Sequence, residues 1–260
     1  MIRVLFLGDI FGRVGRRLVQ ERLPELRERE KIDVALANAE NASGGLGLNA
    51  KNARELLKCG LDGLTGGNHS YKSSDLADVF ADDHRLVRPA NFPDPCPGRG
   101  WTILTSPSGV KVGLGNVMGR VHIGLPLGCP FRAASSLIES MTAAGANITV
   151  IDFHAEATAE KRALAEHLDG KLGALVGTHT HVQTNDAQIL KNGLAFITDL
   201  GMTGPHDSVI GLKADLAVAY FTTGNGLGFK AAVDDPVLEG AIVDFRDDGS
   251  AAAIRTIRTR

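Results

Sequence analysis

The chain alternates short apolar runs with longer amphipathic segments, and this rhythm constrains its fold more than any other feature. The runs 2–7, 33–37 and 61–65 are apolar and short, as buried strands are. The segment 14–30 is charged on one side and carries leucines on the other, as a helix packed on a sheet does. Strands that alternate with helices predict a mainly parallel sheet covered by helices.

The same pattern continues to the end of the chain. Asn49 and Thr158 are predicted to cap helices, because their side chains can accept from first-turn amides. A further helix is predicted to begin at Ser73 or Ser74. The other expected elements are strands at 149–152, 172–176 and 194–198, helices at 49–58, 131–143 and 158–168, and hairpins joining 101–105 to 110–116 and 238–245 to 252–257. No linker divides the chain, so we expect a single domain over residues 1–260.

Composition excludes several classes of protein. The chain has 43% hydrophobic and 22% charged residues, which is ordinary for a globular protein. Its 28 Lys and Arg against 30 Asp and Glu argue against a stable nucleic-acid complex. Three cysteines without a Cys-x-x-Cys spacing indicate a reducing compartment. The first apolar run is too short for a signal peptide, and no stretch reaches the roughly 18 apolar residues of a membrane span. We therefore expect a cytoplasmic protein.

Polar side chains directly follow several of the predicted strands, and their types suit metal binding. Ligands of open α/β sheets bind at the carboxyl ends of the strands, so these side chains are expected to meet at one edge. Carboxylates, amides and imidazoles are ligands for first-row transition metals. The residues are Asp9, Glu40, Asn41, Asn68, His69, His154, His179 and His181.

Charge arithmetic suggests the substrate of such a site. If two divalent ions share Glu40 and also use Asp9, the neutral imidazoles and amides leave the cluster positive, as a phosphate requires. Two neighbouring ions can activate a water for attack at phosphorus. His69 follows the expected ligand Asn68 and could instead protonate the leaving oxygen as a general acid.

The last predicted ligands form a short motif of their own. His179 and His181 are two residues apart, so in an extended chain they would point the same way. Gly177 precedes them and would remove side-chain bulk near the site.

Single residues of this set also have structural interpretations. Asp9 could be a turn or cap residue, Asn38 and Asn41 turn residues, and His154 a hydrogen-bonded structural histidine. It is their common position at strand ends that favours the metal site.

Other polar residues are interpreted more simply. Asp152 and Asp199 could orient the imidazoles from behind. Arg13 and Arg16 could bind phosphate or form a solvated helix start, and His122 could line a pocket. Surface positions are expected for His84, His167 and His206 and for the Lys161-Arg162 pair.

Longer strings resemble a known family. GDIFGRVGR, NAENASGGLGL, GGNHSY, RPANFP, IDFHAEATAEK, VGTHTHVQT and ITDLGMTGP resemble the calcineurin-like metallophosphoesterases, and most closely the YmdB-like phosphodiesterases of bacteria. The chain departs from the wider superfamily at Phe11, where histidine is usual, and at Glu40-Asn41, where Gly-Asp is usual. The YmdB-like branch shares both changes.

The resemblance implies a fold and an activity. The fold is a four-layer α/β sandwich with two central mixed β-sheets flanked by helices. The activity is that of a dinuclear phosphodiesterase on phosphodiesters, in particular 2′,3′-cyclic nucleotides, with attack by a metal-activated hydroxide, His69 as general acid, and a homo-oligomeric state. One ion would be held by Asp9, Glu40, Asn41 and His181, and the other by Glu40, Asn68, His154 and His179.

The metal and two other functions stay open. Iron is the first choice of metal, with manganese and zinc as alternatives. The same site could serve a phosphomonoesterase, or a regulatory protein that binds a nucleotide and turns it over slowly.

Overall fold

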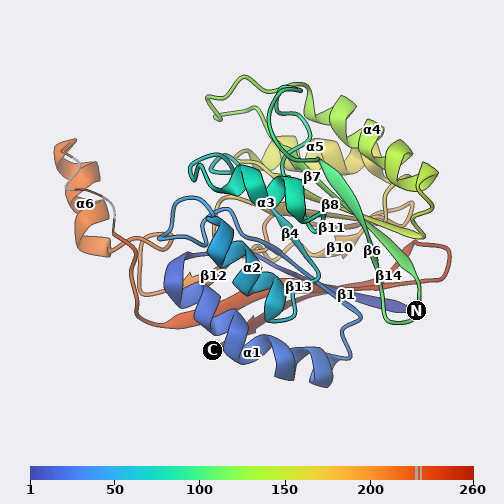
Figure 1. Cartoon of the computed structure of the whole chain (residues 1–260), viewed down its shortest axis with the longest axis horizontal. Helices are drawn as coiled ribbons and strands as arrows, with labels where there is room; N and C mark the ends of the chain where they lie inside the picture. Colours follow the sequence, from blue (N-terminus) through green and yellow to red (C-terminus); the bar gives the residue numbers. More distant parts are fainter. Residues whose placement is uncertain (226–227, 229) are drawn as a thin grey trace.

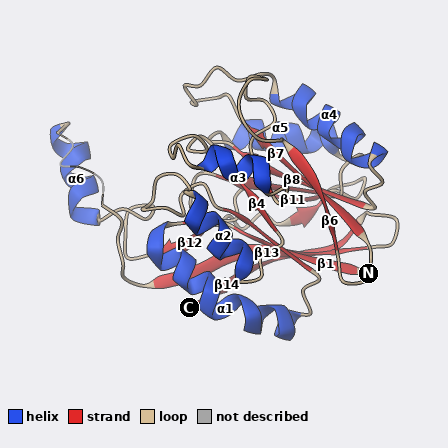
Figure 2. Cartoon of the chain, in the orientation of Figure 1, coloured by secondary structure: helices blue, strands red, loops and turns tan. Residues whose placement is uncertain are grey.

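Two facing β-sheets form the centre of the molecule, and helices cover their outer faces (Figure 1). The computed structural model describes residues 1–225, 228 and 230–260. Figure 2 shows the strands lying between two groups of helices. This is the predicted four-layer α/β sandwich, which is confirmed.

The first sheet has eight strands and is mixed. Its central strand β1 (Ile2–Leu7) runs parallel to β3 (Val34–Asn38) and antiparallel to β13 (Pro236–Phe245). Along the sheet the order is β2 (Asp9–Ile10), β12 (Met202–Pro205), β13, β1, β3, β4 (Gly63–Thr65) and β5 (Leu86–Val87), with β14 (Ala251–Thr259) also paired to β13.

The second sheet has six strands. Parallel strands form its middle and an antiparallel strand closes each edge. The order is β10 (Gln188–Ile189), β11 (Ala195–Ile197), β9 (Ala174–Thr178), β8 (Ile148–His154), β7 (Lys111–Met118) and β6 (Trp101–Thr105).

Alternating side chains explain why both sheets are buried on both faces. In β1, Val4 and Phe6 point into the core between the sheets, while Leu5 and Leu7 pack under helices. Successive side chains of a strand point to opposite faces, so a strand buried on both sides is apolar throughout. The first sheet is covered by α1 (Gly12–Glu30), α2 (Ala50–Lys58) and α3 (Leu76–Asp82), and the second by α4 (Pro130–Ala143) and α5 (Thr158–Leu168).

Several predicted element ends differ from the structure. Asn49 caps α2 as expected, because its side chain accepts from the Asn52 amide. Thr158 is not a cap, since Ala157 takes that position without a side-chain hydrogen bond. The helix expected at Ser73 or Ser74 begins at Leu76, because Ser73 Oγ donates to Asp75 within a turn.

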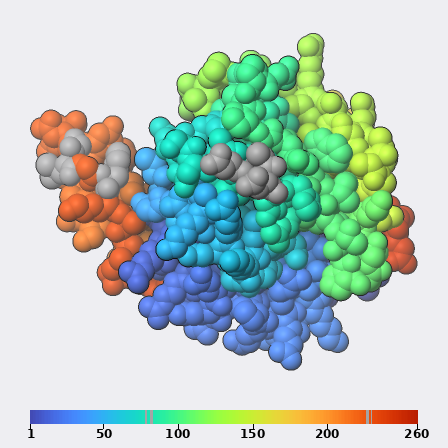
Figure 3. All heavy atoms as spheres, viewed as in Figure 1, coloured from blue at the N-terminus to red at the C-terminus, as the bar shows by residue number. Residues whose placement is uncertain are grey.

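The helix α6 (Ala214–Thr223) was not predicted, and it projects from the body of the molecule (Figures 1 and 3). The residue before α6 is joined to the chain that returns from it, because the Lys213 amide donates to the Lys230 carbonyl. The side chains of Val218 and Phe221 are exposed.

No helix within the described residues is both long enough and apolar enough to cross a bilayer.

Candidate metal centre

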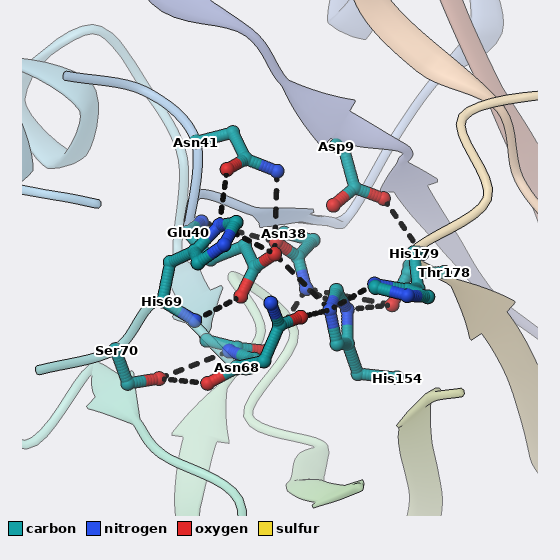
Figure 4. Close-up of polar contacts among 12 residues, drawn as sticks. Asp9, Asn38, Glu40, Asn41, Asn68, His69, Ser70, His154, Thr178 and His179 are labelled. Carbon is teal, nitrogen blue, oxygen red and sulfur yellow. Dashed lines mark hydrogen bonds and ion pairs between the residues drawn. The ribbon is translucent and has the colours of Figure 1, made fainter. Parts of the chain in front are cut away.

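The polar residues that follow the strands meet where the carboxyl ends of the two sheets come together (Figure 4). Asp9, Glu40, Asn41, Asn68 and His69 follow β1, β3 and β4 of the first sheet. In the second sheet, His154 ends β8, and His179 and His181 follow β9. The expectation of a single sheet edge is therefore wrong, since each sheet supplies part of the cluster.

Glu40 joins the two parts of the cluster. Its Oε1 lies 3.1 Å from His154 Nε2 and accepts from Asn41 Nδ2 at 3.2 Å. Its Oε2 accepts from the His69 amide at 2.9 Å. A carboxylate in this position touches residues on both sides and is almost completely buried.

On one side of Glu40 lie Asn41, His181 and Asp9. His181 Nε2 lies 3.2 Å from Asn41 Nδ2 and 3.6 Å from Asp9 Oδ1. Asp9 Oδ2 accepts from the His179 amide at 3.1 Å.

On the other side lie His154, Asn68 and His179. His154 Nε2 is 2.9 Å from Asn68 Oδ1 and 3.1 Å from His179 Nδ1. One ligand atom each from Glu40, His154 and His179 falls within 4.8 Å of the others, which is close enough for all three to bind one ion. The described structure thus brings every predicted site residue together.

Three histidines each have one ring nitrogen tied to an acceptor. His154 Nδ1 lies 2.8 Å from Thr178 Oγ1, and this hydroxyl donates to Asp152 at 2.7 Å, so it must accept from the imidazole. His181 Nδ1 donates to the Ile210 carbonyl at 2.9 Å. His179 Nε2 lies 3.1 Å from Glu156 Oε2. The other nitrogen of each ring faces the cluster, where it can bind a metal once it carries no proton.

The pKa values of the cluster reflect burial and mutual charge. Burial is the largest influence and disfavours the charged form of Asp9, but His181, His154 and the His179 amide together outweigh it and hold the pKa of Asp9 well below its usual range. Burial likewise opposes the charge on Glu40, whose pKa is lowered by His154 and His69. Both carboxylates therefore stay ionised and need positive charge beside them.

The imidazoles shift in opposite directions. Burial lowers the pKa of His179 to about 4, with a contribution from His154. His154 is buried as well, yet Glu40 and Asp9 raise its pKa to about 9. Burial lowers the pKa of His69, against the opposing charge of Glu40.

Two glycines allow these close approaches. A Cβ on Gly67 would come 2.2 Å from Glu40 Oε2 and 2.4 Å from His154 Nε2, so only glycine fits there. Gly177 serves a different purpose from the one expected, because its Cβ would meet the Thr198 carbonyl at 1.7 Å rather than the cluster. It permits β9 and the Thr198 backbone to pack closely.

The turn after β9 differs from the extended segment that we expected. His179 and His181 have φ values of 101° and 64°, in a region that non-glycine residues avoid. The turn therefore sends the two rings to different sides of Glu40. Asp199 Oδ2 holds this turn by accepting from Thr180 N at 3.1 Å and Thr180 Oγ1 at 2.9 Å.

Lys161 is a buried residue, contrary to the surface position that we expected. Its ammonium group donates to Asp199 at 2.8 Å and to the Thr178 carbonyl at 2.9 Å, and both charged side chains are at most 1% exposed. Sequence alone could not show this, because a Lys-Arg pair on a helix usually faces solvent. Asn38 is also buried, at the end of β3, and its role could not be inferred from the sequence either. It donates to Asp152 at 2.9 Å, and its Oδ1 accepts from the Glu40 amide at 3.0 Å.

The remaining candidates lie outside the cluster. Arg16 donates to the Ala42 carbonyl and so supports the loop that follows β3, while Arg13 is exposed. His122 is also exposed. His84 and His167 are at the surface as expected, whereas His206 is only partly exposed and its Nε2 donates to the Met202 carbonyl at 3.1 Å.

Similar proteins agree with this architecture. A 2′,3′-cyclic-nucleotide 2′-phosphodiesterase of Bacillus subtilis is 40% identical over 257 residues, which are 99% of this chain and 96% of that protein. A solved structure of a hypothetical protein from Thermus thermophilus has a TM-score of 0.92 and 38% identity, with 99% of each chain covered. The structure of a novel phosphatase from Mycoplasma pneumoniae has a TM-score of 0.90 and 32% identity, with 99% of this chain and 93% of that one covered.

The match to a family model is nearly as long as the chain. The model describes YmdB-like proteins and matches residues 5–257. The chain belongs to the YmdB-like family.

Proposed function

We propose that this protein is a metal-dependent phosphodiesterase whose substrates are nucleotide phosphodiesters, in particular 2′,3′-cyclic nucleotides. The observation that carries the proposal is the set of three inward-facing imidazole nitrogens around two ionised, buried carboxylates. The name of the Bacillus subtilis relative supports the substrate class.

The residues fit a pair of metal ions. Asp9 Oδ1 is buried and has no hydrogen-bond partner within the described residues, so a cation would satisfy it. Asp9, Glu40, Asn41 and His181 would hold one ion, and Glu40, Asn68, His154 and His179 the other. We infer iron, with manganese or zinc as alternatives, because imidazole and oxygen ligands suit all three. When bound, the two ions supply positive charge to the phosphoryl oxygens and activate water for the attack.

We propose that His69 protonates the leaving oxygen. Asn41 Nδ2 donates to Glu40, so Asn41 Oδ1 is an acceptor, and His69 Nδ1 lies 2.9 Å from it. His69 Nδ1 therefore keeps its proton, and Nε2 is the nitrogen that would give one to the leaving group. Because burial lowers the pKa of the ring, the anionic phosphate of the bound substrate would have to keep Nε2 protonated. The ring lines the cavity beside the cluster and is partly exposed, which gives the leaving group access to it.

The assignment is tested by turnover of the metal-loaded protein. Adenosine 2′,3′-cyclic phosphate should be hydrolysed with a higher kcat/KM than adenosine 2′-monophosphate. Hydrolysis of the monoester alone would make the protein a phosphomonoesterase, an alternative that the similarity to the Mycoplasma pneumoniae phosphatase supports. Recovery of the cyclic nucleotide bound and uncleaved would indicate a regulatory protein.

We also infer that the protein is a homo-oligomer and that α6 takes part in the contact between copies. Helices that are apolar all round are normally buried, and α6 carries one charged residue, Asp215, in ten. The balanced net charge of −2 gives the surface no general attraction for nucleic acid.

A further inference from the structure

The metal cluster opens into a cavity of about 460 Å³ that has two chemically different walls. One wall is formed by polar residues of the cluster, including His69, His179 and His181, and the other by Phe11, Leu46 and Ile210. Leu46 and Ile210 are 55% and 50% exposed, which is unusual for large aliphatic side chains beside a charged centre. Exposed apolar surface in such a place is typical of a ligand-binding groove.

Phe11 fixes the loops that carry these two side chains. A Cβ on Gly45 would come 2.5 Å from the Phe11 ring, and a Cβ on Gly211 would come 2.7 Å from it. The ring therefore lies against the backbone next to Leu46 and next to Ile210. It also contacts His181 edge-on, with the ring centroids 5.6 Å apart, so the apolar wall is held in place relative to the cluster.

The backbone at Ile210 shows that this position is under strain. Its φ is 47°, which is an outlier for a β-branched residue. Glycine or asparagine would adopt the same conformation more easily. The carbonyl of Ile210 orients His181, but any residue could supply a carbonyl. The strained backbone places the aliphatic side chain of Ile210 at the cavity wall, where it can contact a bound ligand.

The geometry points to a binding site for the nucleobase of the substrate, formed by Leu46 and Ile210 with Phe11 behind them. The inference rests on the proposed function, because it places the phosphate at the metal cluster and the base on the apolar wall. A nucleotide matches the cavity in having an anionic group joined to a flat ring with apolar faces. Because the contact is made by aliphatic groups, it should favour substrates that carry a base without selecting strongly which base.

The experiment compares two cyclic phosphates that differ only in the group at C1′ of the ribose, which is a base in one and a methoxy group in the other. Adenosine 2′,3′-cyclic phosphate carries the base, and 1-O-methylribose 2′,3′-cyclic phosphate lacks it. The wild-type protein should prefer the nucleotide through a lower KM. In Leu46→Ser the ratio of kcat/KM between nucleotide and abasic compound should fall about tenfold, as loss of apolar contact in a pocket does.

Two further variants separate the side chain from its surroundings. Ile210→Asn removes the aliphatic group but suits the backbone, so the ratio should fall here without loss of folding. Ile189→Ser is the matched control, because Ile189 is an exposed aliphatic residue on β10, paired with the first residue of β11 at the end of that sheet away from the cluster. Its ratio should equal that of the wild type.

Equal kcat/KM for the two compounds in the wild type would overturn the base site while leaving the phosphodiesterase intact. So would equal losses for both compounds in Leu46→Ser. If neither compound is hydrolysed, the proposed function fails, and calorimetric titration of the same two compounds decides the base site. The base site would be supported if the nucleotide binds more tightly than the compound without a base and if Leu46→Ser weakens that binding. Equal binding of the two compounds would exclude the base site.

Discussion

Asp9 is the residue whose surroundings most directly call for a cation. Its carboxylate is fully buried, one oxygen accepts from the His179 amide, and the other has no hydrogen-bond partner in the described part of the chain. A buried anionic oxygen without a hydrogen bond is costly, and a cation bound beside Asp9 would offset that cost.

Asp9→Asn should lower both the metal content and the activity, because an amide oxygen binds a cation more weakly than a carboxylate does. We expect about one ion per chain in place of two, and kcat/KM reduced by about 100-fold, as loss of a metal's charge stabilisation implies. Elemental analysis and diester turnover measure the two effects. Asp244→Asn, which alters a carboxylate paired with Arg3, is the control. Full metal occupancy in Asp9→Asn would refute the ligand assignment.

His69 should behave differently from Asp9, because we place it at the substrate and not at a metal. His69→Gln is expected to keep its metal and lose about 100- to 10,000-fold in kcat, the usual contribution of a general acid. The loss should be smaller for a p-nitrophenyl diester, whose leaving group needs no proton. His84→Gln, at an exposed histidine, controls for the loss of an imidazole. An equal loss on both substrates would show that His69 is not the acid.

These residue roles were only partly accessible from the sequence. The positions of the ligand types were predictable, because each directly follows an apolar run. The partners behind them, Thr178, Asn38 and Lys161, were not, since they become neighbours only when α5 and both sheets have packed. Nothing in the local sequence separates these residues from ordinary strand and helix residues.

At the scale of elements, α5 supports the turn that follows β9. Lys161 reaches from the helix to Asp199, and Asp199 holds Thr180 between the two histidines of that turn. The buried ion pair therefore links a helix on the outer face of the second sheet to the strained backbone at the site.

Lys161→Met should destabilise the protein by about 3–5 kcal/mol, because it leaves the Asp199 carboxylate buried without its counter-ion. Arg162→Met, at the next residue of the same helix, removes an exposed pair with Glu166 and should cost less than about 1 kcal/mol. Urea denaturation of the two variants gives both values. Similar midpoints for the two variants would show that the buried pair contributes little.

Element boundaries and pairing explain the other differences between prediction and structure. Apolar periodicity located β1, β3 and α5 closely, but it carries no information on which strands are neighbours. The sheet order places β13 beside β1 although the whole of residues 8–235 lies between them in the chain. The apolar helix α6 escaped prediction because it lacks the polar face of a surface helix.

At the scale of the whole molecule, α6 leaves large apolar side chains exposed that nothing else in the described chain covers. The side chain of Phe221 on α6 is 79% exposed. Figure 1 shows α6 projecting from the rest of the molecule. A second copy of the chain would remove that surface from water.

Phe221→Ser should weaken the association between copies, because it removes the largest exposed ring on α6. We expect a smaller sedimentation coefficient at micromolar concentration, with diester turnover per chain measured in parallel. Ile189→Ser, at an exposed apolar residue on an edge strand of the second sheet, is the control. A wild-type protein that sediments as a monomer would contradict the oligomer itself, and an unchanged Phe221→Ser would exclude α6 from its interface.

The contact between Glu40 and His154 couples the geometry of the site to the packing of the two sheets. These two groups come from opposite halves of the core and lie 3.1 Å apart. If one sheet moved relative to the other, the distance between the ligand atoms of the site would change. The packing between the two sheets therefore fixes the spacing of the metal ligands, and ions bound there would link the two sheets to each other.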